Sequence, residues 1–193
     1  MSQGLSARRG IGVLPLVLIL LGIFAGAFLL YRNWKSGVDS GSASREAPPP
    51  ASSGAPGLKT APPFSLKDVN GNVYSSTRFA GKPTVINFFA TWCPPCRNEI
   101  PGFVEVFNRH KGKGFELIGI SLDTDTRGNL AGFITGNRIE YRILIGDLAT
   151  ARSYGGVSSI PTTFFVGKDG EIKNVHVGYI DRDTFEKEVQ KLL

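Results

Sequence analysis

The 193-residue sequence is poor in the residues that most often build metal centres and disulfide frameworks. It contains two cysteines, two histidines and one methionine. Two cysteines are too few for a disulfide scaffold. They are also only half of a tetrahedral zinc site, and His110 and His176 are the only histidines that remain as further ligands. These shortages exclude a disulfide-stapled protein and argue against a structural zinc module.

The sequence also lacks an internal repeat and a region with a strong excess of one charge. The net charge is +6, and it divides evenly. Residues 1–58 hold five basic and two acidic residues, and residues 59–193 hold seventeen and fourteen, so each part carries +3. A domain of mixed sign has no basic stripe for nucleic acid. We therefore expect a globular protein that binds no nucleic acid.

The longest apolar run lies near the N-terminus, at residues 11–31. As a helix it would span roughly 31 Å, which matches a hydrocarbon core of about 30 Å. Arg8 and Arg9 precede it, and aromatic and basic residues follow it between positions 31 and 35. We predict a short cytoplasmic stub at residues 1–10 and a transmembrane anchor at residues 11–31. The alternative is a signal peptide cleaved after Ala27, but the apolar run continues past that position.

A segment dominated by Gly, Ser, Ala and Pro follows, at residues 32–58. Such a composition buries too little apolar surface to form a core, so it predicts a linker. The short N-terminal stub favours export of the long C-terminal part. We therefore expect a single-pass protein of the cell membrane, with a domain at residues 59–193 outside the cytoplasm, on the periplasmic side.

The pattern of residues 59–193 predicts an α/β fold, a mixed central sheet with helices on both faces. Asn70-Gly71 indicates an early β-hairpin. The last helix has Asp183 and Glu186 in a capping-box spacing at its expected start. The other predicted elements are strands at 84–90, 115–122 and 141–145, helices from the cysteines to about 110, at 130–134 and at 149–154, and a hairpin at 162–177.

The two cysteines stand two residues apart, Cys93 and Cys96, where a buried strand gives way to a helix. A helix N-terminus lowers the pKa of a thiol, because unpaired N–H groups and the helix dipole stabilise the thiolate. We assign Cys93, at the helix edge, as the attacking thiol and Cys96, one turn later, as the resolving thiol. Pro94 and Pro95 suit the first helical turn, where missing N–H groups cost nothing.

Three other uses of the cysteine pair compete with this assignment. Capture of Cu(I) by both thiolates is the main alternative. A purely structural disulfide would close a very small loop and stabilise little. A peroxidase would need a threonine and an upstream proline before its cysteine, and the residues before Cys93 do not supply that spacing. Thiol–disulfide exchange is the interpretation that we favour.

Two stretches resemble the thioredoxin superfamily, namely residues 87–99 (NFFATWCPPCRNE) and 159–164 (SIPTTF). The similarity is greatest to its membrane-anchored TlpA/ResA/CcmG-like branch and covers about residues 60–193. The resemblance implies a thioredoxin-like fold with an added N-terminal β-hairpin. It implies that Pro161 is a cis-proline packed against the cysteine pair and that the Ile160 backbone pairs with a substrate strand. Trp92 resembles the aromatic residue before the nucleophile.

One position departs from cytoplasmic thioredoxins, which carry a buried acid where this chain has Asn87. A proton acceptor for Cys96 must then come from elsewhere. Glu99 occupies the place where ResA-like proteins carry a glutamate near the cysteines. We therefore assign Glu99 as base and pKa tuner, and the alternative is an exposed helix glutamate.

The expected function is that of an extracytoplasmic, membrane-tethered thiol–disulfide oxidoreductase with a redox-active Cys93–Cys96 disulfide and no metal or cofactor. By resemblance, its substrate is the disulfide of a specific partner, such as apocytochrome c during cytochrome c maturation or a protein site that receives copper. A membrane thiol donor would re-reduce the pair. We expect a monomer.

Overall fold

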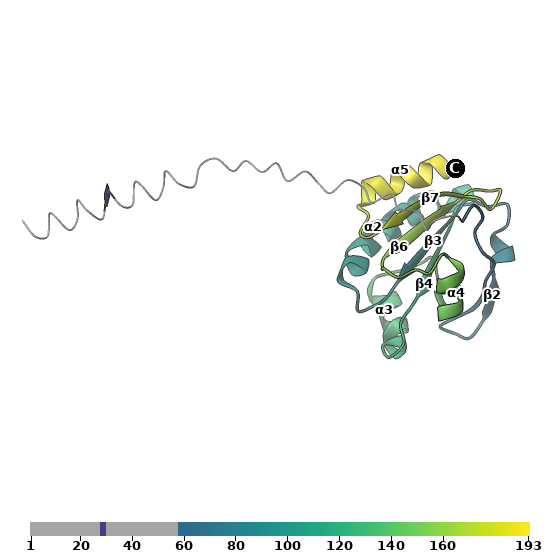
Figure 1. Cartoon of the computed structure of the whole chain (residues 1–193), viewed down its shortest axis with the longest axis horizontal. Helices are drawn as coiled ribbons and strands as arrows, with labels where there is room; N and C mark the ends of the chain where they lie inside the picture. Colours follow the sequence, from purple (N-terminus) through teal and green to yellow (C-terminus); the bar gives the residue numbers. More distant parts are fainter. Residues whose placement is uncertain (1–27, 30–57) are drawn as a thin grey trace, which may run out of the picture. The chain divides into compact units, whose positions relative to one another are not determined.

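The computed structural model describes residues 28–29 and 58–193. Phe28 and Leu29 are helical and exposed, and the remaining residues form the domain in Figure 1. The predicted stub, anchor and linker otherwise fall on residues outside this description. Within the described part of the chain, no helix combines the length and apolar character needed to cross a membrane.

The domain follows the predicted order of a hairpin, a β-α-β-α-β segment, a second hairpin and a final helix. Three short 3-10 helices, which the sequence patterns did not indicate, lie between these elements at Ser76–Phe79 (η1), Lys111–Lys113 (η2) and Arg127–Asn129 (η3). The strands are β1 (Ser65–Asp68), β2 (Val73–Ser75), β3 (Thr84–Phe89), β4 (Glu116–Ser121), β5 (Arg142–Ile145), β6 (Thr162–Val166) and β7 (Ile172–Val177). The α-helices are α2 (Pro94–His110), α3 (Leu130–Gly136), α4 (Leu148–Ser153) and α5 (Arg182–Leu192).

The described residues of the domain build one seven-stranded sheet in the order β2-β1-β5-β4-β3-β6-β7. The three inner strands β5, β4 and β3 are parallel, and the neighbours on either side run antiparallel to them. The N-terminal hairpin β1–β2 therefore extends one side of the sheet, beside β5. The mixed sheet of a thioredoxin-like fold and its added hairpin are both present.

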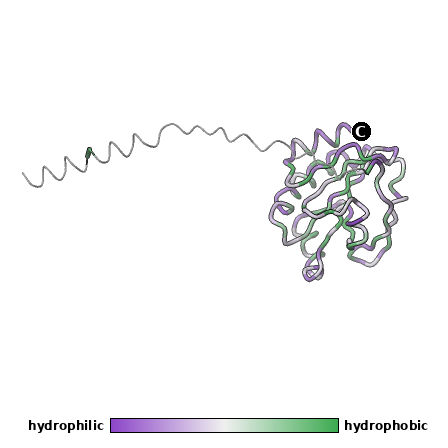
Figure 2. Tube along the Cα trace, viewed as in Figure 1, coloured by the Kyte–Doolittle hydropathy of each residue, from purple (hydrophilic) through white to green (hydrophobic). Residues whose placement is uncertain are grey.

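Strand β3 lies inside the sheet, between β4 and β6, and is buried along its whole length. Its side chains alternate between the two faces, as the pleat of a strand requires. Val85 and Phe89 join an apolar cluster with α2, α3 and α5, whereas Ile86 and Phe88 join a second cluster on the opposite face. In Figure 2 the apolar stretches gather inside the domain, while α5 is mostly hydrophilic along its outer side.

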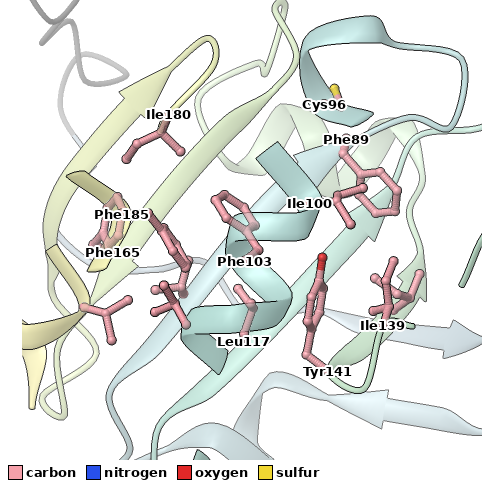
Figure 3. Close-up of a cluster of buried hydrophobic side chains, with 14 of the residues drawn as sticks. Phe89, Cys96, Ile100, Phe103, Leu117, Ile139, Tyr141, Phe165, Ile180 and Phe185 are labelled. Carbon is pink, nitrogen blue, oxygen red and sulfur yellow. The ribbon is translucent and has the colours of Figure 1, made fainter. Parts of the chain in front are cut away.

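The first cluster fixes α2 against the sheet (Figure 3). The rings of Phe103 on α2 and Phe185 on α5 stack with their centroids 3.9 Å apart. Phe165 of β6 lies beside them, with its centroid 6.0 Å from that of Phe185. Each such aromatic side chain buries a large apolar area, so this contact sets the position of α2 and, with it, of the cysteines.

The start of α5 differs from the prediction. Asp183 is not the cap, because the helix begins at Arg182 and Asp181 caps it. The Asp181 carboxylate accepts hydrogen bonds from the N–H groups of Asp183 and Thr184 at 3.1 and 3.0 Å. Glu186 instead binds Arg109 and His110 of α2. An aspartate two residues upstream offered the same capping chemistry, and tertiary packing selected it.

The corrected cap can be tested by substitution. Asp181→Ala is expected to lower the free energy of unfolding by about 1 kcal/mol, since two helix N–H groups lose their acceptor. Asp183→Ala is the matched control and is expected to cost less than half of that, because its exposed ion pair with Arg182 contributes little. Urea unfolding followed by circular dichroism measures both values. A larger loss in Asp183→Ala would reverse the assignment.

Candidate active site

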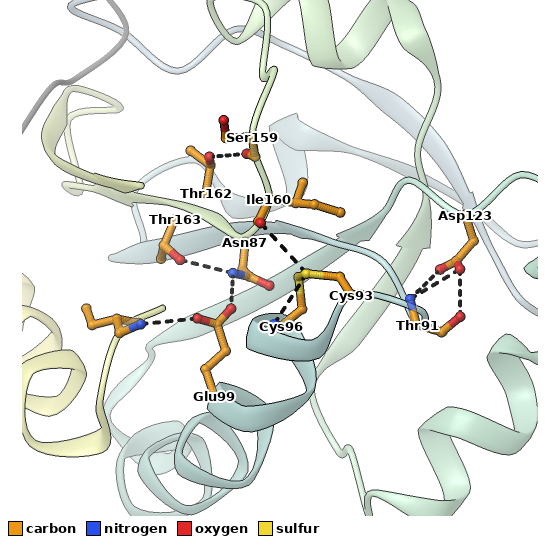
Figure 4. Close-up of a disulfide and its surroundings, with 11 residues drawn as sticks. Asn87, Thr91, Cys93, Cys96, Glu99, Asp123, Ser159, Ile160, Thr162 and Thr163 are labelled. Carbon is orange, nitrogen blue, oxygen red and sulfur yellow. Dashed lines mark hydrogen bonds between the residues drawn. A yellow bond between two sulfur atoms is a disulfide. The ribbon is translucent and has the colours of Figure 1, made fainter. Parts of the chain in front are cut away.

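Cys93 and Cys96 form a disulfide at the N-terminus of α2 (Figure 4). Cys93 is the N-cap residue, and its Sγ accepts a hydrogen bond from the Cys96 N–H at 3.4 Å. Pro94 and Pro95 occupy the first helical turn, as predicted. In this oxidised state Cys93 is 3% exposed and Cys96 is fully buried, so the two residues differ little in exposure.

The segment before β6, the strand that pairs with β3, approaches the disulfide. The Ile160–Pro161 peptide bond is cis, which confirms that prediction. The Ile160 carbonyl oxygen lies 3.7 Å from Cys93 Sγ. The Pro161 carbonyl accepts the N–H of Gly178 at 2.8 Å, which joins this loop to the end of β7. Trp92 precedes Cys93 and is 59% exposed, so the surface beside the disulfide carries an aromatic side chain.

Glu99 and Asn87 meet on the α2 side of β3. The Asn87 Nδ2 group donates to Glu99 Oε1 at 2.9 Å and to Thr163 Oγ1 at 3.0 Å. The Ile180 N–H donates to the other carboxylate oxygen at 3.4 Å. Glu99 is 2% exposed, so the alternative of an exposed helix glutamate was wrong. Thr163 and Ile180 were not singled out from the sequence.

The environment of Glu99 changes its acidity. Burial raises the pKa of the Glu99 carboxyl to about 8, and the hydrogen bonds from Asn87 and Ile180 oppose this shift only in part. Burial also raises the pKa of Tyr141, and the nearby Glu99 charge adds to that effect. At neutral pH the Glu99 carboxyl is therefore mostly protonated. A buried acid whose pKa lies close to that of a thiol is suited to exchange protons with one.

On the other side of the disulfide lies a buried acid that the sequence reasoning missed, Asp123 (Figure 4). Its carboxylate accepts the Thr91 N–H at 3.0 Å and the Thr91 hydroxyl at 2.6 Å. The signal was present as a threonine and an aspartate, each directly after a predicted strand, at 84–90 and 115–122. Carboxyl ends of neighbouring parallel strands meet at one edge of a sheet, where sites commonly form.

A dithiol at a helix N-terminus, set against a cis-proline loop on a thioredoxin-like sheet, defines a thiol–disulfide exchange site. The AhpC/TSA family matches residues 58–175, and the chain belongs to that family. Its similarity to curated and solved thiol–disulfide proteins agrees with the site, and the protein is a thiol–disulfide oxidoreductase.

Three relatives illustrate the similarity. The thiol-disulfide oxidoreductase ResA of Geobacillus thermodenitrificans is 26% identical over 183 residues, covering 93% of this chain and 95% of its own. ResA of Oceanobacillus iheyensis is 31% identical, over 65% of this chain and 67% of its own. The crystal structure of a thioredoxin-family thiol:disulfide interchange protein from Chlorobium tepidum aligns with a TM-score of 0.64 and 33% identity, covering 70% and 97% of the two chains.

The raised pKa of Glu99 predicts a pH-dependent stability. Between its unfolded pKa of 4.5 and its folded pKa of about 8, the folded state holds a proton that the unfolded state has lost. Stability should therefore fall as pH rises through this window and level off above it. Each pH unit between the two pKa values lowers the free energy of unfolding by about 1.4 kcal/mol, so the total fall is on the order of a few kcal/mol.

Urea unfolding of the oxidised protein between pH 4.5 and 9 measures this fall. Glu99→Gln is expected to flatten it, because the substituted side chain carries no titrating proton. Glu105→Gln, an exposed glutamate on the same helix, is the control and should keep the wild-type profile. A Glu99→Gln protein that retains the full pH dependence would show that another group is responsible.

Proposed function

We propose that this protein is an extracytoplasmic, membrane-tethered reductase that acts on the disulfide of a specific partner protein. The observation that carries the proposal is the position of the Cys93 sulfur, at the N-cap of α2 and 3.7 Å from the Ile160 carbonyl. An extended substrate segment that pairs with the Ile160 backbone would bring its own disulfide to this sulfur.

The reaction follows from the order of the two sulfurs along α2. In the reduced protein the Cys93 thiolate attacks one sulfur of the substrate disulfide, forming a mixed disulfide and releasing the other substrate sulfur as a thiolate. Cys96 then attacks the Cys93 sulfur, which releases the second substrate thiolate and forms the Cys93–Cys96 disulfide. Two electrons pass from the pair to the substrate. The Cys96 N–H, 3.4 Å from Cys93 Sγ, stabilises the attacking thiolate.

Glu99 is proposed as the proton acceptor for the second step. It lies one helical turn beyond Cys96 on α2, where residues three apart share a face. Asn87 and Ile180 hold its two oxygens, so the carboxyl group has a fixed orientation. Only the ionised carboxylate can accept the Cys96 proton, and with a pKa of about 8 this form is the minority at neutral pH and grows as pH rises. A base whose pKa is near that of its partner exchanges protons with it efficiently.

The proposed partner is a protein on the outer side of the membrane. The uncharged apolar run at residues 11–31 and the Gly/Ser/Pro-rich segment at residues 32–58 support a tethered domain at residues 59–193. A tether raises the effective concentration of the dithiol near partners in the same membrane. The relatives named ResA support this branch, whose resemblance implies apocytochrome c as substrate and a membrane thiol donor as electron source.

The role of Glu99 can be measured with an aromatic disulfide that releases one coloured thiol on attack and a second on resolution. In Glu99→Gln the first phase is expected to keep its wild-type rate, and the second to slow by about a hundredfold at pH 8. Glu105→Gln is the control for a lost glutamate on α2. Two unchanged phases would remove Glu99 from the mechanism.

The partner can be trapped with Cys96→Ser, which leaves Cys93 able to attack and unable to be resolved. Expressed as the full chain in membranes, this variant is expected to accumulate mixed disulfides that reductant releases, and mass spectrometry should identify a c-type cytochrome or a maturation factor. Cys93→Ser is the control and should trap nothing, since Cys96 is assigned to attack the Cys93 sulfur and not the substrate.

Two outcomes would contradict the proposal. The absence of any disulfide-linked partner would reject the partner-directed reductase. Stoichiometric retention of Cu(I) by wild type, lost in Cys96→Ser and accompanied by no mixed disulfide, would favour the copper-handling alternative.

A further inference from the structure

Asp123 is buried, at 1% exposure, two residues beyond the end of β4. Four donor groups point at its carboxylate: the N–H and hydroxyl of Thr91, the hydroxyl of Ser121 at 2.7 Å and the hydroxyl of Thr126. Burial alone would raise the pKa of Asp123, but the hydrogen bonds from Thr126, Thr91 and Ser121 outweigh it and lower the pKa. The side chain is therefore an ionised, fully hydrogen-bonded carboxylate.

Asp123 joins its own loop, residues 121–126, to the start of α2, 32 residues earlier in the sequence. Ser121 ends β4, Thr126 precedes η3, and Thr91 begins the turn that leads into α2. The contact with Thr91 continues the parallel register of the two strands, in which Phe89 pairs with Ser121. Only the Thr91 contact leads toward the cysteines.

The path from Thr91 to the sulfur is short. Thr91 and Trp92 form the turn that the Cys93 N–H closes on the Ala90 carbonyl at 3.2 Å. Cys93 then caps α2, and its sulfur faces the Cys96 N–H. A shift of Thr91 therefore moves the N-cap relative to the first N–H of the helix. The stabilisation of an anion at a helix terminus is short-ranged, falling off within the first turn.

We propose that Asp123 is a positioning residue for thiol–disulfide exchange: by holding the backbone and hydroxyl of Thr91, its carboxylate sets the Cys93 sulfur against the N-terminus of α2. This inference rests on the assignment of Cys93 as the attacking thiol. Asp123 touches neither sulfur in the hydrogen-bond network and acts through Thr91.

The direction in which the Cys93 thiol pKa changes when Asp123 is substituted separates a positioning role from a charge effect. A nearby negative charge disfavours a thiolate, so removing it would lower the Cys93 thiol pKa. Removing a positioning contact has the opposite effect, because the sulfur loses its alignment with the helix N-terminus and the thiol pKa rises. In the wild type the Thr91 N–H contacts both oxygens of the Asp123 carboxylate. The amide of Asp123→Asn has only one acceptor oxygen, so this contact is weakened.

The experiment measures the alkylation rate of Cys93 in the reduced full-length protein, in detergent, between pH 5 and 9. Mass spectrometry assigns the modified cysteine. In Asp123→Asn the midpoint of the profile is expected to move to higher pH, and the rate at pH 7 to fall by about threefold to tenfold. Thr91→Val, which removes the hydroxyl and keeps the N–H, is expected to shift the profile the same way by less.

Thr126→Val is the matched control, because it removes a donor from the same carboxylate on the side away from the cysteines. Its profile should stay within about twofold of wild type even if its urea midpoint falls, since the Thr91 contact is intact.

In the double variant Thr91→Val/Asp123→Asn, the effect should not exceed that of Asp123→Asn alone. Should Asp123→Asn fail to fold, Thr91→Val decides the question by the direction of its shift.

An Asp123→Asn profile that coincides with wild type while stability falls would overturn the proposal, because the residue would then be merely structural. A shift to lower pH would overturn it in favour of a charge effect. Faster alkylation of Cys96 than of Cys93 in the wild type would refute the assignment of the attacking thiol. The relative alkylation of the two cysteines is measured in the wild type alone. It therefore tests the assignment of Cys93 separately from the comparison of Asp123→Asn with the wild type.

Discussion

The site depends on one hydrogen bond, from the Cys96 N–H to the Cys93 sulfur at the first turn of α2. Only three residues separate the end of β3 from Cys93, so the position of the helix start relative to the strand decides whether this bond is made. The aromatic contact between Phe103 and Phe185 fixes the helix from one end, and the turn at Thr91 fixes it from the other. Packing and polar contacts thus serve the same alignment.

Two buried acids flank the disulfide, and their environments give them opposite charge states. Glu99 receives two hydrogen bonds in an apolar surrounding, and burial dominates, so its carboxyl stays protonated at neutral pH. Asp123 receives hydrogen bonds from four donor groups, and these dominate, so its carboxylate stays ionised. The protonated acid can release its proton as pH rises, whereas the ionised one stays charged and holds the Thr91 N–H and hydroxyl. The number of hydrogen-bond donors around each carboxyl group therefore accounts for the difference in charge state.

Much of the fold was predictable, because its central elements carry strong local signals. The apolar run of β3 and the helical periodicity after Cys96 gave both elements to within a residue or two. Contacts between distant positions were not predictable. Glu99 is buried through Asn87 and Ile180, 12 and 81 residues away, and Asp123 meets Thr91 from 32 residues away. The capping of α5 was misplaced because Asp181 and Asp183 lie two residues apart and offer the same capping chemistry.

The prolines at the start of α2 have a consequence for which ions this helix end accepts. Helix N-termini usually bind phosphate, sulfate and carboxylate through several free N–H groups. Here Pro94 and Pro95 contribute none, and the next N–H, that of Cys96, is already directed at the Cys93 sulfur. The Arg97 N–H after it donates to the Cys93 carbonyl, so the first turn offers dissolved anions no free N–H group.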